Sequence, residues 1–380
     1  MKAAVIAEFL GYSGGDLVNI IIIKTLINAG YEVEIFTNNY KSYFEAYFNF
    51  EEFIPKDIKI HVISTSLPSP YSIYELTNKV RYHDNRYHII VLNDDIPKNI
   101  SRINYDLALI YIHFPHAARV TFNVLIEAKY RHNTINKIAW TIHKKMFPSL
   151  FYVKGSLPEN TMLLANSTLT YHFLKILWPS TEIKVIYPPV QAKKIFKKAI
   201  RQLNSKDDQA VLIGRIMPDK KIDEVILALP YLSIIKKVKI IGPIIDFKYF
   251  NYIRKIIHKL SLEKKVEFTG LVSRNKVIEI LSKSKILIHS MPMEPFGIVV
   301  VEGMAAGCIP VVKKGPNGPW IDITERGKYG YGFRDKRDLI STLKTIMNNY
   351  EKLNLKKIYS RYLQFDESLF IQNFMKVLRK

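Results

Sequence analysis

Two glutamates frame an apolar segment in the second half of the chain, and their positions indicate chemistry. Glu294 stands in a proline-containing loop, and Glu302 follows inside the apolar run IVVVEGMAA, which is predicted to be a short helix. A buried carboxylate without a partner is costly, so these acids need a ligand or a counter-charge. The helix would begin beside Phe296 and Gly297, where free backbone N–H groups and the positive end of the helix dipole suit a phosphate. Carboxylates that can bind hydroxyl groups, next to backbone amides that can bind a phosphate, indicate a nucleotide-sugar site.

Two cationic side chains share one loop of the same half of the chain. Arg215 and Lys220 follow an apolar run of strand length at residues 210–213. An arginine fork can hold two oxygens of a diphosphate, and a lysine adds a point charge. Gly270 forms a turn after another predicted strand. Because ligands of open α/β sheets bind at the carboxyl ends of the strands, these groups are expected beside the two glutamates.

Strand- and helix-length segments also alternate in the first half of the chain, as in a parallel α/β sheet. A predicted strand at residues 3–7 leads through a glycine loop into an apolar helix at residues 17–28. The loop lacks the G-x-G-x-x-G spacing, so Gly14 and Gly15 form either a plain turn or a place where a ligand approaches the backbone. His113 directly follows a predicted strand, where open α/β sheets bind ligands. Both a structural and a catalytic role stay open for this histidine.

A domain boundary is predicted near the middle of the chain. Pro188-Pro189 and the basic run at residues 192–201 separate two series of alternating strands and helices. At 380 residues the chain is also long for one hydrophobic core. The chain is predicted to end in helices at residues 338–356 and 367–380. Two α/β domains imply a cleft, which is a common ligand site.

The net charge of the chain limits which classes of binding partner are expected. The chain has 56 Lys and Arg residues against 34 Asp and Glu, a net charge of +22, which favours diphosphates or anionic lipid headgroups. Nucleic acid is not expected, because no zinc-ligand spacing, RNP-type motif or helix-turn-helix signature is recognisable. A P-loop is absent from the sequence, so P-loop phosphoryl transfer is not expected. The single cysteine, Cys308, excludes an internal disulfide framework and is expected to be a small buried residue.

Membrane attachment is expected at the surface only. No signal peptide is recognisable, and no stretch reaches the roughly 18–20 apolar residues of a membrane span, so an intracellular protein is expected. Residues 40–53 carry Tyr43, Phe44, Tyr47 and Phe48 at helical spacing. That aromatic face is either a buried stripe or a surface that touches lipid. The pair Asp94-Asp95 is interpreted as a surface loop, not as a metal site.

Taken together, the glutamate pair and the cationic loop resemble a known family. The pattern E-x-F-G-x-x-x-x-E from Glu294 to Glu302 and the pattern G-R-x-x-x-x-K from Gly214 to Lys220 look like those of retaining glycosyltransferases of family 4. Residues 268–270 and 330–333 resemble two further turns of the same family. Weaker similarities in both halves are closest to the mannosyltransferases that extend lipid-linked oligosaccharides, and they lie at residues 111–115, 166–167, 187–189 and 317–323.

The resemblance implies the GT-B fold, an α/β architecture of two Rossmann-like domains whose parallel sheets face each other across a cleft. Residues 1–190 would form the N-terminal acceptor-binding domain, and residues 191–362 the C-terminal nucleotide-sugar-binding domain. Residues 363–380 would form a helix that packs back on the N-terminal domain.

The resemblance also implies a role for each candidate residue. Glu294 would contact the donor sugar and Glu302 the ribose, while Arg215 and Lys220 would bind the diphosphate. His113 would be the acceptor-side histidine near the reacting carbon, so that His113 and Glu294 form the catalytic pair. The remaining donor-binding positions would be Gly14, Gly15, Gly270, Phe296, Gly297, Ile298 and Val299.

The activity implied by this resemblance is retaining transfer of a hexose, mannose in the first place, to a lipid-linked glycan. The donor would be a nucleoside-diphosphate sugar, either GDP-mannose or a UDP-hexose. No cofactor or metal is expected, because the two cations would stabilise the leaving diphosphate. The expected location is the cytoplasmic face of an anionic membrane, as a peripheral protein. Alternatives are transfer to a polysaccharide or small molecule, nucleotide-sugar epimerisation, and a catalytically retired protein that binds glycans or nucleic acid.

Overall fold

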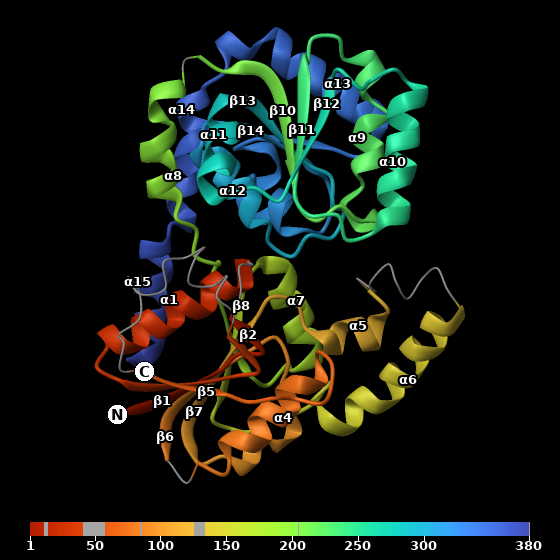
Figure 1. Cartoon of the computed structure of the whole chain (residues 1–380). Helices are drawn as coiled ribbons and strands as arrows, with labels where there is room; N and C mark the ends of the chain where they lie inside the picture. The colour runs from red at the N-terminus through yellow and green to blue at the C-terminus, as the bar shows by residue number, and fades with distance from the viewer. Residues whose placement is uncertain (11–13, 41–57, 84–85, 125–133, 204, 380) are drawn as a thin grey trace. The chain divides into compact units, whose positions relative to one another are not determined.

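The chain divides into two compact units. The computed structural model describes residues 1–10, 14–40, 58–83, 86–124, 134–203 and 205–379. Unit 1 comprises Met1–Pro189 with Glu367–Lys380, and unit 2 comprises Val190–Asp366 (Figure 1). The sequence predicts these boundaries at 190/191 and 362/363. In the structure the second boundary lies after Asp366, later than predicted. The reason is that the ring of Phe365 packs edge-on against Phe296 of unit 2, with ring centroids 5.5 Å apart.

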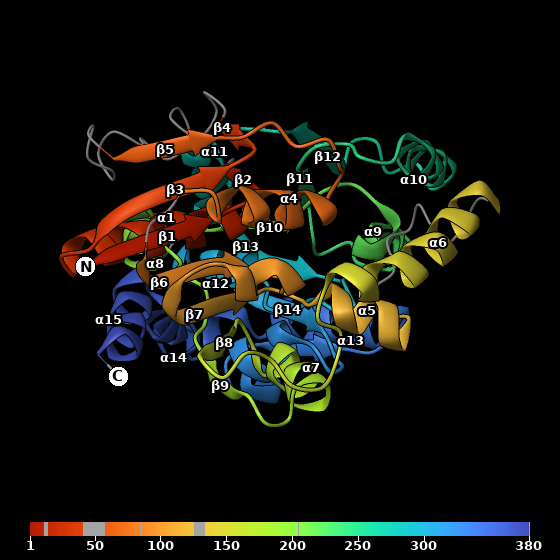
Figure 2. The ribbon, with the colours of Figure 1, turned by 90° about the horizontal axis from the view of Figure 1, so that it is seen from below.

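Unit 1 is built on one parallel sheet of seven strands. In chain order these are β1 (Lys2–Ile6), β3 (Glu32–Thr37), β5 (Lys59–Val62), β6 (Tyr87–Asn93), β7 (Tyr105–Ile112), β8 (Thr161–Ala165) and β9 (Glu182–Val185), and a separate pair is formed by β2 (Phe9–Leu10) and β4 (Asn39–Tyr40). The strands pair in the order β5-β3-β1-β6-β7-β8-β9, which Figure 2 shows along the sheet. The order runs outwards in both directions from β1 and β6, so the carboxyl ends of these two strands form the switch point where such sheets bind ligands.

Helices cover both faces of this sheet. They are α1 (Gly14–Asn28), α4 (Tyr71–Val80), α5 (His116–Phe122), α6 (Thr134–Leu150), α7 (Thr168–Leu177) and α15 (Glu367–Leu378), with a 3₁₀ turn at Lys98–Arg102. Successive residues of a strand point to opposite faces. Ala3 and Val5 therefore pack with α1 and α15, whereas Ala4 and Ile6 pack with α4 to α7. Strands buried on both faces explain the near-continuous apolar runs in the sequence.

The C-terminal helix belongs to unit 1, as predicted. Phe370, Phe374 and Val377 of α15 recur at helical spacing and join the same buried cluster as α1. The ring of Phe370 meets that of Tyr111 from β7 at 5.9 Å. Figure 1 shows α15 beside α1. The predicted aromatic face at residues 40–53 lies, apart from Tyr40, outside the described residues.

Unit 2 is built on a second parallel sheet, of six strands. These are β10 (Asp207–Ile213), β11 (Lys237–Ile241), β12 (Val266–Gly270), β13 (Ser284–His289), β14 (Ile309–Lys313) and β15 (Tyr331–Phe333). They pair in the order β12-β11-β10-β13-β14-β15, the 3-2-1-4-5-6 order of a Rossmann-type sheet. The switch point here lies between β10 and β13. The loops that carry Arg215, Lys220 and Glu294 leave the sheet at this point.

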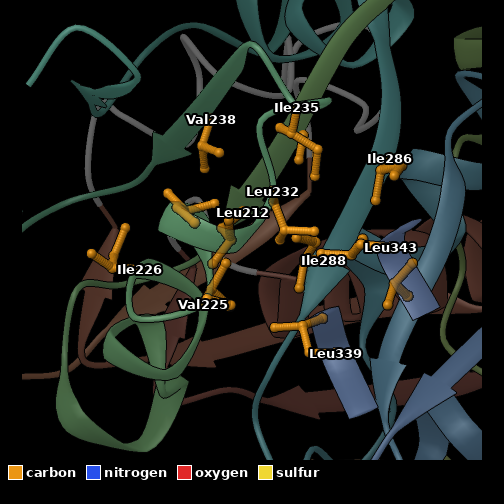
Figure 3. Packing of buried hydrophobic residues seen from close by; sticks show 14 of the residues in the cluster. Leu212, Val225, Ile226, Leu232, Ile235, Val238, Ile286, Ile288, Leu339 and Leu343 are labelled. Carbon is orange, nitrogen blue, oxygen red and sulfur yellow. The ribbon is translucent and has the colours of Figure 1, made fainter. Parts of the chain in front are cut away.

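Two layers of helices cover the second sheet. They are α8 (Ala192–Ala199), α9 (Ile222–Ile226), α10 (Phe247–Lys259), α11 (Arg274–Lys283), α12 (Ile298–Ala305), α13 (Lys336–Asn348) and α14 (Leu355–Ser360), with short turns at Ile200–Gln202, Pro218–Lys220, Leu229–Tyr231, Pro319–Ile323, Glu325–Gly327, Tyr350–Lys352 and Arg361–Phe365. Figure 1 shows α9, α10 and α13 on one face and α8, α11, α12 and α14 on the other. Figure 3 shows the first layer packing on Leu212 and Ile288 of the sheet.

Two predictions about unit 2 have different outcomes. The helix predicted over residues 338–356 is wrong in its length, because α13 ends at Asn348 and a turn at Tyr350–Lys352 precedes α14. Tyr350 is buried in the core there, so the chain bends to place its ring. Cys308 is fully buried, as predicted, and burial raises the pKa of its thiol to about 11. A thiol with so high a pKa is a poor nucleophile at neutral pH.

Candidate active site

The carboxylate of Glu294 is the centre of the polar site in unit 2. Its Oε2 atom lies 3.0 Å from Nζ of Lys220 and 3.3 Å from Nε2 of His289, the last residue of β13. Lys220 comes from the loop after β10, so the switch point of the sheet brings the two loops together. The side chain of Glu294 is 18% exposed and that of Lys220 is 20% exposed. Both groups are therefore held by the protein yet still reachable from solvent.

The protonation of Glu294 follows from these contacts. Burial alone would raise the pKa of this carboxyl, but the charge of Lys220 and the hydrogen bond and charge of His289 outweigh burial and hold the pKa well below its ordinary value. Glu294 is consequently ionised at neutral pH. An ionised carboxylate accepts hydrogen bonds and cannot donate one, so Glu294 is suited to hold hydroxyl groups and not to act as a general acid.

The loop that carries Glu294 is clamped from a second segment. The fully buried side chain of Asn317 donates from Nδ2 to the carbonyls of Pro292 and Lys313, at 3.0 Å each. The amide of Gly318 donates to the carbonyl of Glu294 at 3.0 Å. A Cβ atom on Gly318 would lie 2.3 Å from a backbone oxygen of the same loop, so only glycine permits this approach. The segment at residues 317–323, which resembles the mannosyltransferases, thus holds the loop of Glu294 in position.

The loop enters α12 through a left-handed residue. Gly297 has φ +91°, and a Cβ atom there would lie 2.8 Å from Pro319, so glycine is required at this helix entry. The first amides of an α-helix have no acceptor within the helix, which leaves those of Ile298 and Val299 suited to phosphate. The side chain of Phe296 is 2% exposed and packs on Phe365. Of the predicted donor contacts, Phe296 can therefore offer only its backbone.

Glu302 lies one turn into α12 and is paired with an arginine that sequence reasoning missed. Its Oε1 atom lies 2.5 Å from Nη2 of Arg274, the first residue of α11. The carboxylate is 8% exposed and the guanidinium 27% exposed. Gly270 ends β12 at φ +67°, and the turn after it leads to α11, so this glycine positions Arg274. Arg215 stands exposed in the loop after β10, and no side chain in the described part of the chain pairs with it.

Replacing Arg274 with methionine should raise the KM for the sugar-nucleotide donor by about tenfold and leave kcat nearly unchanged. The reason is that Arg274 holds the buried carboxylate of Glu302, which is predicted to bind the ribose of the donor. A contact that is equally strong in the ground state and the transition state changes KM alone. Initial rates at varied donor concentration measure this split. Arg334→Met, which removes an exposed arginine–aspartate pair of the same unit, is the matched control. A fall in kcat with unchanged KM would contradict this role of Arg274.

A second polar site lies in unit 1, at the switch point of the first sheet. A cavity of about 160 Å³ is lined by Glu8, Asp16, Asn19, Asn93, Asp94, Asp95, His113 and His116, together with Gly15, Ser69, Pro70 and Ile73. A single water needs only roughly 10–15 Å³, so the cavity has room for a polar group larger than water. The structure brings together His113 and Gly15 here, whereas Gly14 is exposed at the start of α1.

Three acids of this cavity are held by defined contacts. Asp94 accepts the amide hydrogens of His113 and Phe114 at 2.7 and 3.3 Å. Asp95 lies 2.9 Å from Nδ1 of His116 and is 4% exposed. Burial raises the pKa of Glu8, although hydrogen bonds from Ser72 and Ser69 oppose this shift. The interpretation of Asp94-Asp95 as a surface loop is wrong, because β6 delivers both residues into the cavity.

His113 lines this cavity and has one ring nitrogen without a partner among the described residues. Its Nε2 atom is buried, and no described residue forms a hydrogen bond with it. The ring packs edge-on against Tyr111 with centroids 5.2 Å apart, which fixes its direction. Such a nitrogen can accept or donate one hydrogen bond to a ligand hydroxyl.

Comparison with known proteins supports the fold of the whole chain and the family of its C-terminal half. Residues 193–361, somewhat less than half of the chain, match the family model described as glycosyl transferases group 1. Anabaena HepE, solved with UDP and glucose, superposes with a TM-score of 0.72 over 100% of this chain and 99% of its own, at 17% identity. Sucrose-phosphate synthase from Thermosynechococcus elongatus gives a TM-score of 0.72 and 17% identity over 100% and 98% of the two chains. The chain has the GT-B fold of these structures, and its residues 193–361 match the glycosyl transferases group 1.

Several relatives by sequence share the name GDP-Man:Man(3)GlcNAc(2)-PP-Dol alpha-1,2-mannosyltransferase. The protein of Dictyostelium discoideum is 24% identical over 300 residues, which cover 71% of this chain and 58% of the relative. That of Caenorhabditis elegans is 24% identical over 310 residues, or 73% and 65% of the two chains. That of Kluyveromyces lactis is 27% identical over 64% and 49%. The matched region therefore spans about half to two thirds of these relatives.

Several residues of the two polar sites were missed by sequence reasoning. His289 could have been found as a polar residue at the end of an apolar strand, and Glu8 by the same signal after β1. Arg274 and His116 carry no such signal, because they stand on helices and meet their partners only in the folded chain. In the part of the chain that the structure describes, the helices are all too short or too polar to cross a bilayer.

Proposed function

We propose that this glycosyltransferase moves mannose from GDP-mannose to a lipid-linked glycan with retention of the anomeric configuration. The names of the sequence relatives, which specify GDP-Man and a PP-Dol-linked glycan, support the donor and the acceptor. The proposal includes a peripheral position on the cytoplasmic face of a membrane. It also includes independence of metals, since Arg215 and Lys220 offer two cations for the diphosphate.

The contact of Glu294 with Lys220 carries this proposal. A sugar nucleotide has hydroxyl groups and phosphates only a few bonds apart, so its site needs an acceptor for hydroxyls next to a cation. Glu294 and Lys220 provide the two groups 3.0 Å apart at the end of the sheet. The amides at the start of α12 add donors for the diphosphate, and Glu302 lies one turn further on for the ribose.

The reaction would use these groups as follows. The bond between the anomeric carbon and the diphosphate oxygen breaks, and the diphosphate leaves with the electron pair. The acceptor hydroxyl oxygen forms its bond to the same face of that carbon, and the diphosphate oxygen takes the hydroxyl proton. Lys220 and Arg215 stabilise the charge that grows on the leaving group. The acceptor sugar would lie in the unit 1 cavity, where Asp94, Asp95 and His113 can bind its hydroxyls.

Thermal unfolding of the full chain with GDP-mannose, UDP-glucose, UDP-galactose and ADP-glucose tests the donor. We expect GDP-mannose at about 100 times its Kd to raise Tm by about 5 °C or more, which corresponds to about 2.7 kcal/mol of linkage. Mass spectrometry of a lipid-linked glycan incubated with the preferred donor then tests the transfer. Unchanged Tm with every sugar nucleotide would overturn the donor site, and sugar conversion without acceptor would indicate an epimerase.

A further inference from the structure

Helix α6 of unit 1 exposes an apolar stripe to solvent. Ile138, Ile142 and Met146 are 56, 51 and 49% exposed. They recur every four residues, so at 3.6 residues per turn they form one row along the helix. Figure 1 shows α6 (yellow) next to α5. Single exposed apolar residues are ordinary, but a continuous row on one helix is not.

This stripe is not the face that holds α6 on unit 1. The inward face carries His143, which is 2.9 Å from the hydroxyl of Tyr71, and Phe147, which stacks on Phe151 with centroids 4.5 Å apart. Phe147 and Phe151 are fully buried. The helix is therefore anchored by one face and still presents apolar side chains on another. Folding of unit 1 does not require Ile138, Ile142 and Met146 to be apolar.

The charge beside the stripe indicates which partner covers it. Lys137 and Lys145 are exposed and lie in the row next to the apolar one, with Thr141 between them. α6 also contains Lys144 and has no acidic residue anywhere in its sequence. An apolar row flanked by lysines is typical of helices that lie in the interface of an anionic bilayer, with the apolar side chains among the acyl chains and the ammonium groups at the headgroups.

We propose that the outer face of α6 docks this glycosyltransferase on an anionic lipid surface. The helix lies in the plane of the interface, Ile138, Ile142 and Met146 enter the acyl boundary, and Lys137 and Lys145 contact lipid phosphates. This surface adds a membrane-docking site to the proposed function. It rests on that function in one respect, because the lipid-linked acceptor is the reason for the protein to be at a membrane.

Co-sedimentation of the full chain with vesicles tests the proposal. Vesicles of phosphatidylcholine with 30% phosphatidylserine should bind the wild type, and the triple variant Ile138→Ser, Ile142→Ser, Met146→Ser should bind at least tenfold more weakly. The double variant Lys137→Glu, Lys145→Glu should also bind more weakly, by about fivefold or more for each lysine, which corresponds to about 1 kcal/mol. Pure phosphatidylcholine vesicles should bind the wild type weakly.

The matched control removes three apolar side chains of unit 2 that are at least as exposed on average, by Tyr231→Ser, Ile245→Ser and Phe247→Ser, and should bind vesicles like the wild type. Undiminished binding of the α6 triple variant would overturn the proposal, as would equal loss in the control. A wild-type dimer that the α6 triple variant dissolves would assign this face to a second copy of the chain instead. Sugar-nucleotide thermal shifts, measured in parallel, report on the proposed function alone, because α6 carries no donor-site residue.

Discussion

Lys220→Met should lower kcat for glycosyl transfer by about 100- to 1000-fold with little change in the KM for the acceptor. Lys220 is the cation that contacts Glu294, and in the proposed reaction its charge stabilises the diphosphate as it leaves. Removing one preorganised charged donor of this kind typically costs that factor in kcat. Initial-rate measurements with saturating acceptor give the number directly. Among the described residues, the carboxylate of Glu294 would then keep the contact with His289, at 3.3 Å.

The matched control for this variant is Lys285→Met. Lys285 is about as buried as Lys220 and pairs with the more exposed Asp208, 2.7 Å away, at the start of β13. Lys220 lies beyond the other end of that strand. This control should retain activity within about threefold while losing similar stability. Glu294→Gln should reduce activity as strongly as Lys220→Met, and the double variant should be little worse than either single one, because the two groups act as a unit. Wild-type kcat in Lys220→Met, in a folded protein, would contradict the assignment of the site.

Lys206→Met should lower the free energy of unfolding of unit 2 by about 3 kcal/mol or more, or Tm by roughly 6–12 °C. Lys206 is 9% exposed, and its Nζ lies 2.8 to 3.3 Å from the carbonyl oxygens of Leu281, Ser282, Ser284 and Ala306. These carbonyls close the carboxyl ends of α11 and α12. Burial lowers the pKa of this lysine, because removing the ammonium group from water disfavours its charged form.

Removing the ammonium group of Lys206 is destabilising because the four carbonyl oxygens that accept its hydrogen bonds would stay buried. An unsatisfied buried acceptor costs about 1–3 kcal/mol, and the methionine side chain offers no donor. α11 begins with Arg274 and α12 contains Glu302, so looser helix ends would also weaken donor binding. Lys236→Met, which removes an exposed lysine bonded to a single carbonyl, is the control and should change Tm by less than about 2 °C. Equal Tm values for Lys206→Met and the wild type would contradict this role.

The local structure of both units could be predicted from the sequence, because it depends on neighbours along the chain. Apolar runs of four to six residues predict strands such as β1, β8 and β14, since strands covered on both faces must be apolar throughout. Gly297 and Glu302 are separated from Glu294 by fixed spacings, so the order of acid, helix entry and second acid is visible in the sequence. The strand–helix alternation predicts the parallel sheets for the same reason.

Contacts between distant residues were decided only by the tertiary structure. His289, Glu294 and Lys220 meet because β10 and β13 are neighbours at the switch point, and strand order is not written in local periodicity. Asp94 and Asp95 look like an exposed loop in the sequence, yet the end of β6 delivers them into the cavity of unit 1. Lys206 finds its four carbonyls 75 to 100 residues away. The sequence by itself determined which groups could do chemistry, and the packing of strands and helices decided which of them share a site.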